Sequence, residues 1–111
     1  MSAYDGDRDC GQGEGWEAWH DRMPGGPATL HVTGTLSCPT PGYEVVLERH
    51  EPQGINPRDL LLRLTETKPE GVQPEVITPV PVEYREETDA SYDTVSIVPD
   101  GPASIPVQEV S

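Results

Sequence analysis

The sequence predicts an all-β protein: an immunoglobulin-like β-sandwich or, as the alternative, a partly open barrel. Three observations indicate this class. Tyr43, Val45 and Leu47 alternate with polar residues, which is the two-residue period of a half-buried strand. The run Leu60–Leu64 repeats that spacing after a turn-rich segment, so the two runs together predict a β-hairpin. The other apolar runs are equally short and are separated by proline and glycine turns, as in sandwiches and barrels.

Six strands are expected along the chain. In the first of them, leucine and valine alternate with threonine and histidine, and threonine-rich outer faces suit strands. The segment 56–67 is ambiguous, because Asn56 and Pro57 are also typical of a helix start. We favour a strand there, since its leucines recur at every second position. The expected strands cover residues 28–37, 43–50, 56–67, 75–84, 94–98 and 105–110.

The expected strand over residues 75–84 contains Pro79 and Pro81. Both lack a backbone N–H, and because they are two residues apart, the missing donors point to the same side of the strand. We therefore expect this strand either to lie at an edge of the sheet, where its proline-rich side would be open to a binding partner, or to be covered there by something that needs no donors.

One domain is the most that 111 residues allow. Only 33% of the residues are hydrophobic and phenylalanine is absent, so we expect a small core. The alternation begins near residue 27, which predicts a β-sandwich domain over residues 27–110 and a flexible acidic arm over residues 1–26. No apolar run of about 18 residues is present, so we expect no membrane insertion.

Two tryptophans, Trp16 and Trp19, stand out in this polar arm. Their spacing of three residues would place them on one face of a short helical turn through Glu17–His20. Such side chains either fold back over an open end of the sandwich or anchor a docking peptide, because tryptophan is favoured at interfaces. The sequence leaves both interpretations open.

Acidic residues give the chain a net charge of −13. The net charge is −4 over residues 1–26, −1 over residues 27–68 and −8 over residues 69–111, so the last third is the most acidic. Nucleic-acid binding is not expected, since affinity for phosphate needs clustered lysine and arginine. A basic protein partner would be attracted, although a role in solubility alone also accounts for the charge.

The chain has two cysteines, Cys10 and Cys38. A disulfide between them would tie the arm to the end of the first expected strand and would indicate an oxidising compartment. The alternative is two free thiols in a cytosolic protein. The N-terminus lacks the basic start and apolar run of a signal peptide, so the chain is either cytosolic or a form whose leader has been removed. We favour a periplasmic or secreted location, and the sequence indicates no oligomeric state.

No motif for catalysis, a metal or a cofactor is found. The glycine-x-serine-x-glycine elbow of many hydrolases is missing, and the three histidines lack the spacing of metal ligands. Asp5, Asp7 and Asp9 resemble the start of a calcium loop, but Cys10 and Trp16 stand where such a loop needs glycine and glutamate. We therefore expect no enzymatic activity, no catalytic residue, no metal and no cofactor.

Two loops are stiffened by proline and glycine, at residues 51–57 and 68–74, and the second contains Pro69 and Gly71. Stiff loops bind partners at a lower ordering cost. The first functional hypothesis is a non-enzymatic protein-interaction module that uses the proline-rich edge strand and adjacent loops, or the tryptophan arm. The alternative is a peptidase inhibitor that acts through one of the rigid loops.

Three runs of the sequence resemble a known family: Thr40–Leu47, Leu60–Pro69 and Pro79–Tyr84. They show a glycine and an aromatic residue opening one strand, a strand ending before a proline, and a last strand that contains prolines. In these features residues 40–84 resemble the C-terminal domain of bacterial protease-complex-associated proteins. The resemblance implies an extracytoplasmic, non-enzymatic, protein-binding domain without a catalytic residue.

Overall fold

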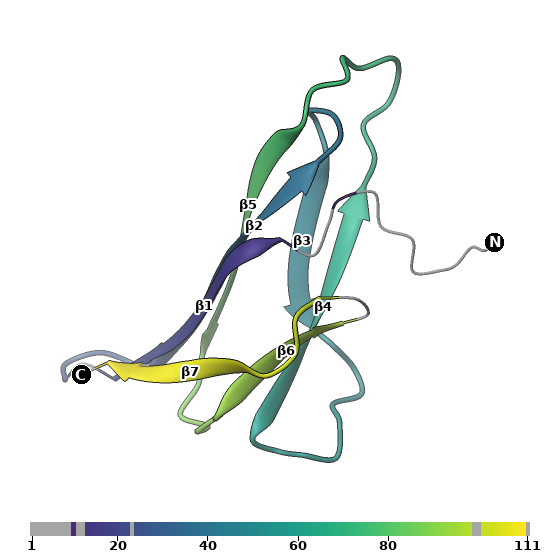
Figure 1. Cartoon of the computed structure of the whole chain (residues 1–111). Coiled ribbons are helices and arrows are strands. Elements are labelled where there is room, and N and C mark those ends of the chain that lie inside the picture. Colours follow the sequence, from purple (N-terminus) through teal and green to yellow (C-terminus); the bar gives the residue numbers. More distant parts are fainter. Residues whose placement is uncertain (1–9, 11–12, 23, 99–100, 111) are drawn as a thin grey trace.

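The computed structural model describes residues 10, 13–22, 24–98 and 101–110. These residues contain seven β-strands and no helix, so the predicted all-β class is confirmed. The strands, labelled in Figure 1, are β1 (Glu14–Asp21), β2 (Thr29–Cys38), β3 (Glu44–Arg49), β4 (Asp59–Thr67), β5 (Thr78–Glu87), β6 (Thr94–Val98) and β7 (Ile105–Val110).

The seven strands form one mixed sheet in the order β3-β4-β6-β7-β1-β2-β5. Four neighbouring pairs run antiparallel, whereas β1 with β7 and β4 with β6 run parallel. The two end strands, β3 and β5, also approach each other, so the sheet is nearly closed. The strands β2, β3, β4 and β5 extend to one end of the molecule, and β6 and β7 lie near the other (Figure 1).

β7 joins the two halves of this sheet. Its first residues, Ile105 and Pro106, pair with β6. The residues that follow, 107–110, pair with β1. Pro106 stands where the strand changes partner, and a proline suits this place because it has no N–H that a ladder would have to satisfy.

β1 lies where the sequence pattern predicted a flexible arm. Residues 14–21 form a strand between β7 and β2, so the sheet begins well before the expected boundary at residue 27. The helical turn through Glu17–His20 is therefore wrong, because these residues are extended and pair with β2, and Ala18–His20 also pair with β7. Residues 1–9 of the predicted arm, with the aspartates of the suggested calcium loop, lie outside the described residues.

The predicted hairpin is confirmed, because β3 and β4 pair antiparallel with Leu47 opposite Leu64. The alternative of a helix start before β4 is wrong. The side chain of Asn56 instead accepts a hydrogen bond from the Arg58 amide (3.0 Å) in a turn that leads into the strand. Alternate leucines of β4 are buried, as the two-residue period required.

β5 is an end strand of the sheet, which confirms the prediction made from its prolines. It begins and ends three residues later than predicted, at Thr78 and Glu87. Pro79 and Pro81 lie opposite β2 in the ladder. Because alternate residues of an antiparallel strand direct their N–H groups away from the partner, two prolines at such positions leave the bonds to β2 intact.

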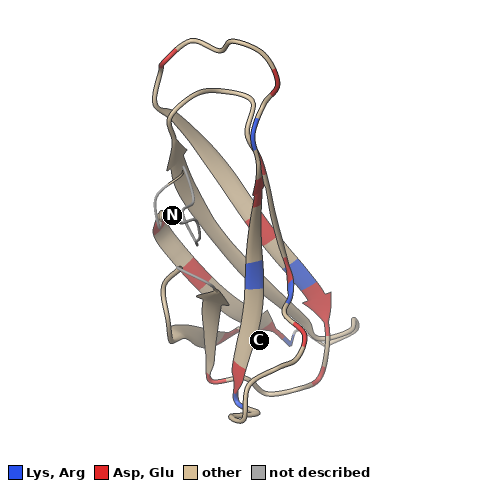
Figure 2. Cartoon of the chain, turned by 90° about the vertical axis from the view of Figure 1, so that its right-hand side faces the viewer, with Lys and Arg blue, Asp and Glu red and all other residues tan. Residues whose placement is uncertain are grey.

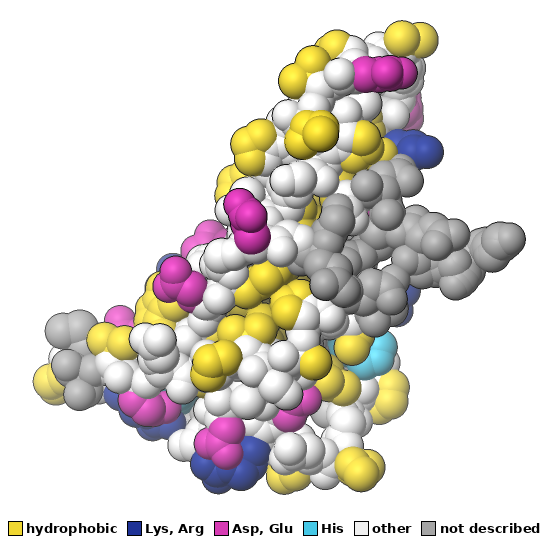
Figure 3. Space-filling view, viewed as in Figure 1, with side chains coloured by type: hydrophobic (Ala, Val, Ile, Leu, Met, Phe, Trp, Pro, Cys, Tyr) yellow, Lys and Arg dark blue, Asp and Glu magenta, His cyan; other side chains and the backbone are white. Residues whose placement is uncertain are grey.

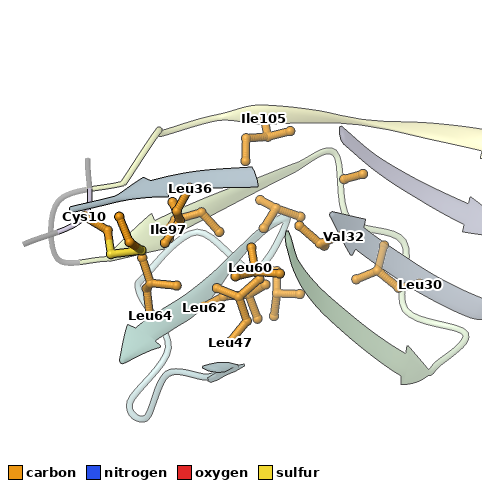
Figure 4. Packing of buried hydrophobic residues seen from close by; sticks show 14 residues of the cluster. Cys10, Leu30, Val32, Leu36, Leu47, Leu60, Leu62, Leu64, Ile97 and Ile105 are labelled. Carbon is orange, nitrogen blue, oxygen red and sulfur yellow. A yellow bond between two sulfur atoms is a disulfide. The ribbon is translucent and has the colours of Figure 1, made fainter. Parts of the chain in front are cut away.

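The core contains aliphatic side chains and one disulfide. Figure 4 shows the buried leucines of β2, β3 and β4 pointing towards one another, together with Ile97 of β6 and Ile105 of β7. Trp16 of β1 packs against this cluster. Its ring lies over Gly34, where an added Cβ would come within 2.6 Å of the indole carbons, so glycine is what permits the close approach.

Cys10 and Cys38 are joined by a disulfide, with their Cα atoms 4.2 Å apart. Both residues are buried in the core cluster. The bridge ties the segment before β1 to the last residue of β2, and Cys10 lies at the edge of the core in Figure 4.

Candidate functional site

Residues 68–77, named here the apical loop, connect β4 to β5 at one end of the molecule (Figure 1). Val72 is fully exposed, and Ile77 and Val76 are 75% and 57% exposed. In Figure 3 hydrophobic side chains cover this end of the molecule, with acidic ones beside them. Exposed aliphatic side chains that gather in one place mark interaction sites, whereas scattered ones carry no such meaning.

The backbone of the apical loop is held in place although it lacks regular secondary structure. The Gln73 side chain donates a hydrogen bond to the Glu70 carbonyl (2.9 Å). Pro69 lies against the turn before β3, since a Cβ on Gly42 would come within 2.9 Å of it. Gly71 has a φ of 80°, which residues with a side chain rarely adopt. The exposed valines therefore stand on an ordered loop.

The outer face of β5 extends this surface through Pro79 and Pro81, which are both exposed. Pro81 also lines an open hollow of about 430 Å³, together with Thr33 and Thr35 of β2 and with Glu83. Two of the predicted binding residues, Pro69 and Gly71, thus belong to the apical loop, and the other two, Pro79 and Pro81, belong to the strand that follows it. We name the exposed apolar residues the apical patch: Val72, Val76, Ile77, Pro79 and Pro81.

Acidic side chains lie beside the apical patch. Glu70 and Glu75 are exposed within the loop, and Glu83 is exposed on β5. Figure 2 shows acidic residues on both sides of the loop. Lys68 is the first residue of the loop. A partner that fits this surface needs apolar side chains at its centre and positive charge at its rim.

The two tryptophans do not share a face, so this prediction is wrong. A spacing of three residues places them on one face of a helix but on opposite faces of a strand. Trp16 packs against the core. Trp19 faces outwards and stacks on His31 of β2, with ring centroids 5.0 Å apart. Neither tryptophan is part of the apical patch.

A second exposed loop connects β3 to β4 over residues 50–58, and Ile55 in it is fully exposed (103%). The Gln53 amide holds the first side of this loop. It donates to the His50 carbonyl (2.6 Å) and the Leu61 carbonyl (3.0 Å), and it accepts from the Leu61 amide (3.0 Å). Ile55 could not be singled out from the sequence, because one apolar residue in a turn has no periodic signal.

The other side of this loop is held by Arg58 and the residues around it. The Asp59 amide donates to the Asn56 carbonyl (3.1 Å). The Arg58 guanidinium donates two hydrogen bonds to Asp93, at 2.6 and 2.7 Å. These bonds and the positive charge of Arg58 lower the pKa of Asp93. The loop is therefore fixed at both ends, and its middle projects with Ile55.

A polar cluster links the two end strands of the sheet. Arg49, at the end of β3, lies 3.3 Å from both carboxylate oxygens of Glu86 on β5 and 3.4 Å from the hydroxyl of Tyr92. Tyr84 also donates its hydroxyl hydrogen to Glu86. Burial, and after it the hydrogen bond to Glu86, raises the pKa of Tyr84 well above its ordinary value. The cluster serves to close the sheet.

Replacing Tyr84 by phenylalanine is expected to reduce the loss of stability at alkaline pH. The pKa of Tyr84 is higher in the folded chain than in the unfolded chain, where it is about 10, so the neutral phenol favours folding. This contribution is complete below a pH of about 10 and is lost as the pH rises above it. Melting temperatures of both proteins should therefore differ most near pH 8 and converge towards about pH 11. A difference that stays constant would contradict the linkage.

Both cysteines and the first residue of β4 have partners within the fold. Cys10 and Cys38 are bonded to each other, so neither has a free thiol. Asp59 accepts hydrogen bonds from Thr94 (2.7 Å) and Ser96 (3.0 Å), which joins β4 to β6. Within the described residues, no three side chains of histidine, cysteine, aspartate or glutamate gather as a metal site would require. No helix in this part of the chain is long and apolar enough to cross a membrane.

Comparisons with known proteins give no relative for this chain: no family model, no curated protein and no solved structure matches it. The resemblance of residues 40–84 to a bacterial domain therefore stays a prediction. The function has to be inferred from the two exposed loops and their surroundings.

Proposed function

We propose that this chain is a non-enzymatic protein-interaction module and that the apical patch is its binding surface. The observation that carries the proposal is the exposure of Val72, Val76 and Ile77 on one ordered loop. Burying an aliphatic side chain at an interface gains about 1.5–3 kcal/mol relative to leaving it in water. Because the loop is already held, little of this gain is lost in ordering it.

The prolines of β5 define how a partner docks. An exposed sheet edge normally invites a further strand, which would bond to its N–H groups. Pro79 and Pro81 remove two such donors, so the partner contacts side chains of the patch and does not extend the sheet. The acidic rim supported by Glu70 and Glu75 favours a partner with basic residues.

We also propose that the all-β fold is an immunoglobulin-like β-sandwich of a bacterial, extracytoplasmic type. Its support is the core, in which side chains of β2 meet those of β3 and β4 (Figure 4). The disulfide between Cys10 and Cys38 fits an oxidising compartment, which supports a periplasmic or secreted location.

Replacing Val72, Val76 and Ile77 together by serine is expected to remove partner binding while the fold is retained, because all three are exposed. Wild type and variant are immobilised and exposed to extracts of the source cells and medium. Proteins bound to the wild type are identified by mass spectrometry and then purified. The affinity of such a partner should fall at least about 30-fold in the variant, since the loss of one anchor costs about 2 kcal/mol.

The matched control is Ile55→Ser, which makes the same kind of change in the loop at the opposite end of the molecule (Figure 1). It should keep the partner at wild-type affinity. Equal binding of a partner to the wild type and the triple variant would overturn the assignment of the apical patch. A loss confined to Ile55→Ser would move the binding surface to the loop over residues 50–58.

A second candidate function, inhibition of a peptidase, is favoured by the loop over residues 50–58. Ile55 is fully exposed there, while Gln53 and Arg58 hold the two sides of the loop. A rigid loop with an exposed side chain is the arrangement by which inhibitors bind peptidases with little change of shape. Stoichiometric inhibition of a peptidase by the wild-type protein would support this function.

A further inference from the structure

We propose that the loop over residues 50–58 is a substrate-like inhibitory loop and that Ile55 enters the specificity pocket of a serine peptidase. This inference rests on the second candidate function and names its target class. The fold does not depend on the side chain of Ile55, because this side chain is fully exposed (103%). The loop lies at the end of the molecule opposite the apical patch, where a large partner can approach it (Figure 1).

Contacts on both sides of Ile55 hold the backbone of the loop in place. Gln53 binds the backbone of Leu61 through both atoms of its amide, which fixes the chain before Ile55. Gly54 lies close against the same residue, since a Cβ there would be 3.3 Å from the Leu61 side chain. The Asn56 carbonyl accepts the Asp59 amide, which fixes the chain after Ile55. Ile55 thus projects from a segment that is anchored on both sides to β4.

The residues next to Ile55 indicate the class of peptidase. Chymotrypsin-like and subtilisin-like serine peptidases select mainly the residue before the bond they attack. Papain-like cysteine peptidases depend strongly on the residue one position earlier, which is Gly54 here and has no side chain. Pro57 stands two positions after Ile55, so Asn56 keeps the N–H group that a peptidase meets directly after the attacked bond. The pattern fits a serine peptidase.

The side chain of Ile55 indicates the pocket within that class. It is branched, apolar and uncharged, so it fits an apolar pocket of moderate depth, as in elastase-like enzymes. Hydrophobic pockets discriminate aliphatic side chains by size only weakly, whereas a charged pocket discriminates charge strongly. A change of charge at residue 55 therefore gives a sharper test than a change of size.

The test measures inhibition of pancreatic elastase, chymotrypsin and trypsin by wild type and Ile55→Arg with chromogenic substrates. Wild type is expected to inhibit elastase stoichiometrically. Ile55→Arg is expected to inhibit trypsin at least about 100-fold more strongly than wild type does, because the trypsin pocket contains a carboxylate that pairs with arginine. Circular dichroism is used to check that the variant is folded, as expected for a change at an exposed position.

Two further variants test whether trypsin inhibition needs the held loop or only an exposed arginine. Val72→Arg places an arginine at an equally exposed valine of the apical loop, and it should not inhibit trypsin. Gln53→Ala, added to Ile55→Arg, removes the three hydrogen bonds of the Gln53 amide. It should weaken trypsin inhibition about 10-fold, which corresponds to about 1.4 kcal/mol, and should speed cleavage after residue 55.

The outcomes distinguish this inference from the function on which it rests. Cleavage of Ile55→Arg after residue 55 without inhibition would overturn the assignment of an inhibitory loop. If wild type inhibits one of the peptidases and changes at residue 55 leave that inhibition unaltered, inhibition stands and the role of Ile55 is refuted. If neither protein inhibits any of the three peptidases, both the inference and the second candidate function fail, and the apical patch is untouched by that result.

Discussion

Replacing Leu62 by alanine should lower the free energy of unfolding by about 3 kcal/mol, within the range seen for buried leucines. Leu62 is completely buried on β4, where it lies opposite Ile97 of β6 in the parallel ladder. The change removes apolar atoms from a site that its neighbours cannot fill, so the loss of burial is increased by the cost of a cavity. A domain of this size has about 5–15 kcal/mol of stability in total, so this single change removes a large part of it.

The measurement is urea unfolding of wild type and variant, followed by circular dichroism. Val46→Ala on β3 is the control, because Val46 is 51% exposed and its truncation should change stability by at most about 0.5 kcal/mol. A similar small effect of Leu62→Ala would mean that the strands β4 and β6 do not enclose the core as described.

Removing the disulfide is expected to have an effect of similar size. The bridge closes a loop between residues separated by 28 positions, and a cross-link of this length stabilises by about 3.5 kcal/mol in the chain-entropy description. The double variant Cys10→Ala, Cys38→Ala should therefore melt at a lower temperature than the oxidised wild type. Each cysteine has to be replaced together with its partner, because a single change would leave a buried free thiol.

The reductant dithiothreitol supplies the check on this second prediction. It should lower the melting temperature of the wild type towards that of the double variant and leave the double variant unchanged. Hydrogen exchange should show the largest loss of protection in β1, since the bridge fixes the segment directly before that strand. A wild-type melting temperature that does not change when the reductant is added would contradict the predicted contribution of the bridge.

Six of the seven strands could be predicted because their signal is local. In β4, for example, leucines at alternate positions face the core, and this period does not depend on the partner strand. β1 lacked this signal. Its buried residues are Ala18 and His20, and this pair forms no recognisable hydrophobic pattern in the sequence. A bulge between Glu14 and Glu17 also interrupts the alternation. The parallel pairings were also beyond prediction, because a period identifies a strand but not its neighbour.

The candidate site could be predicted only where a residue type has a fixed structural consequence. Pro79 and Pro81 indicated an edge strand, since each lacks a donor in any fold. Trp16 and Trp19 were misplaced because their relation depends on whether the chain is helical or extended. The exposure of Ile55 could not be predicted, because it depends on how Gln53 holds the loop. That hold comes from a hydrogen bond to Leu61, and the sequence pattern does not reveal such a contact.

The parallel pairing of β1 with β7 has a mechanical consequence. A pulling force applied at Glu14 and at Val110 runs along these two strands in opposite directions. The hydrogen bonds between parallel strands lie across that force, so they are loaded together in shear and not one after another as in an unzipped hairpin. The ladder between β1 and β7 is therefore the part of the sheet that bears the force. A partner held at the apical patch would pull on elements outside this pair of strands.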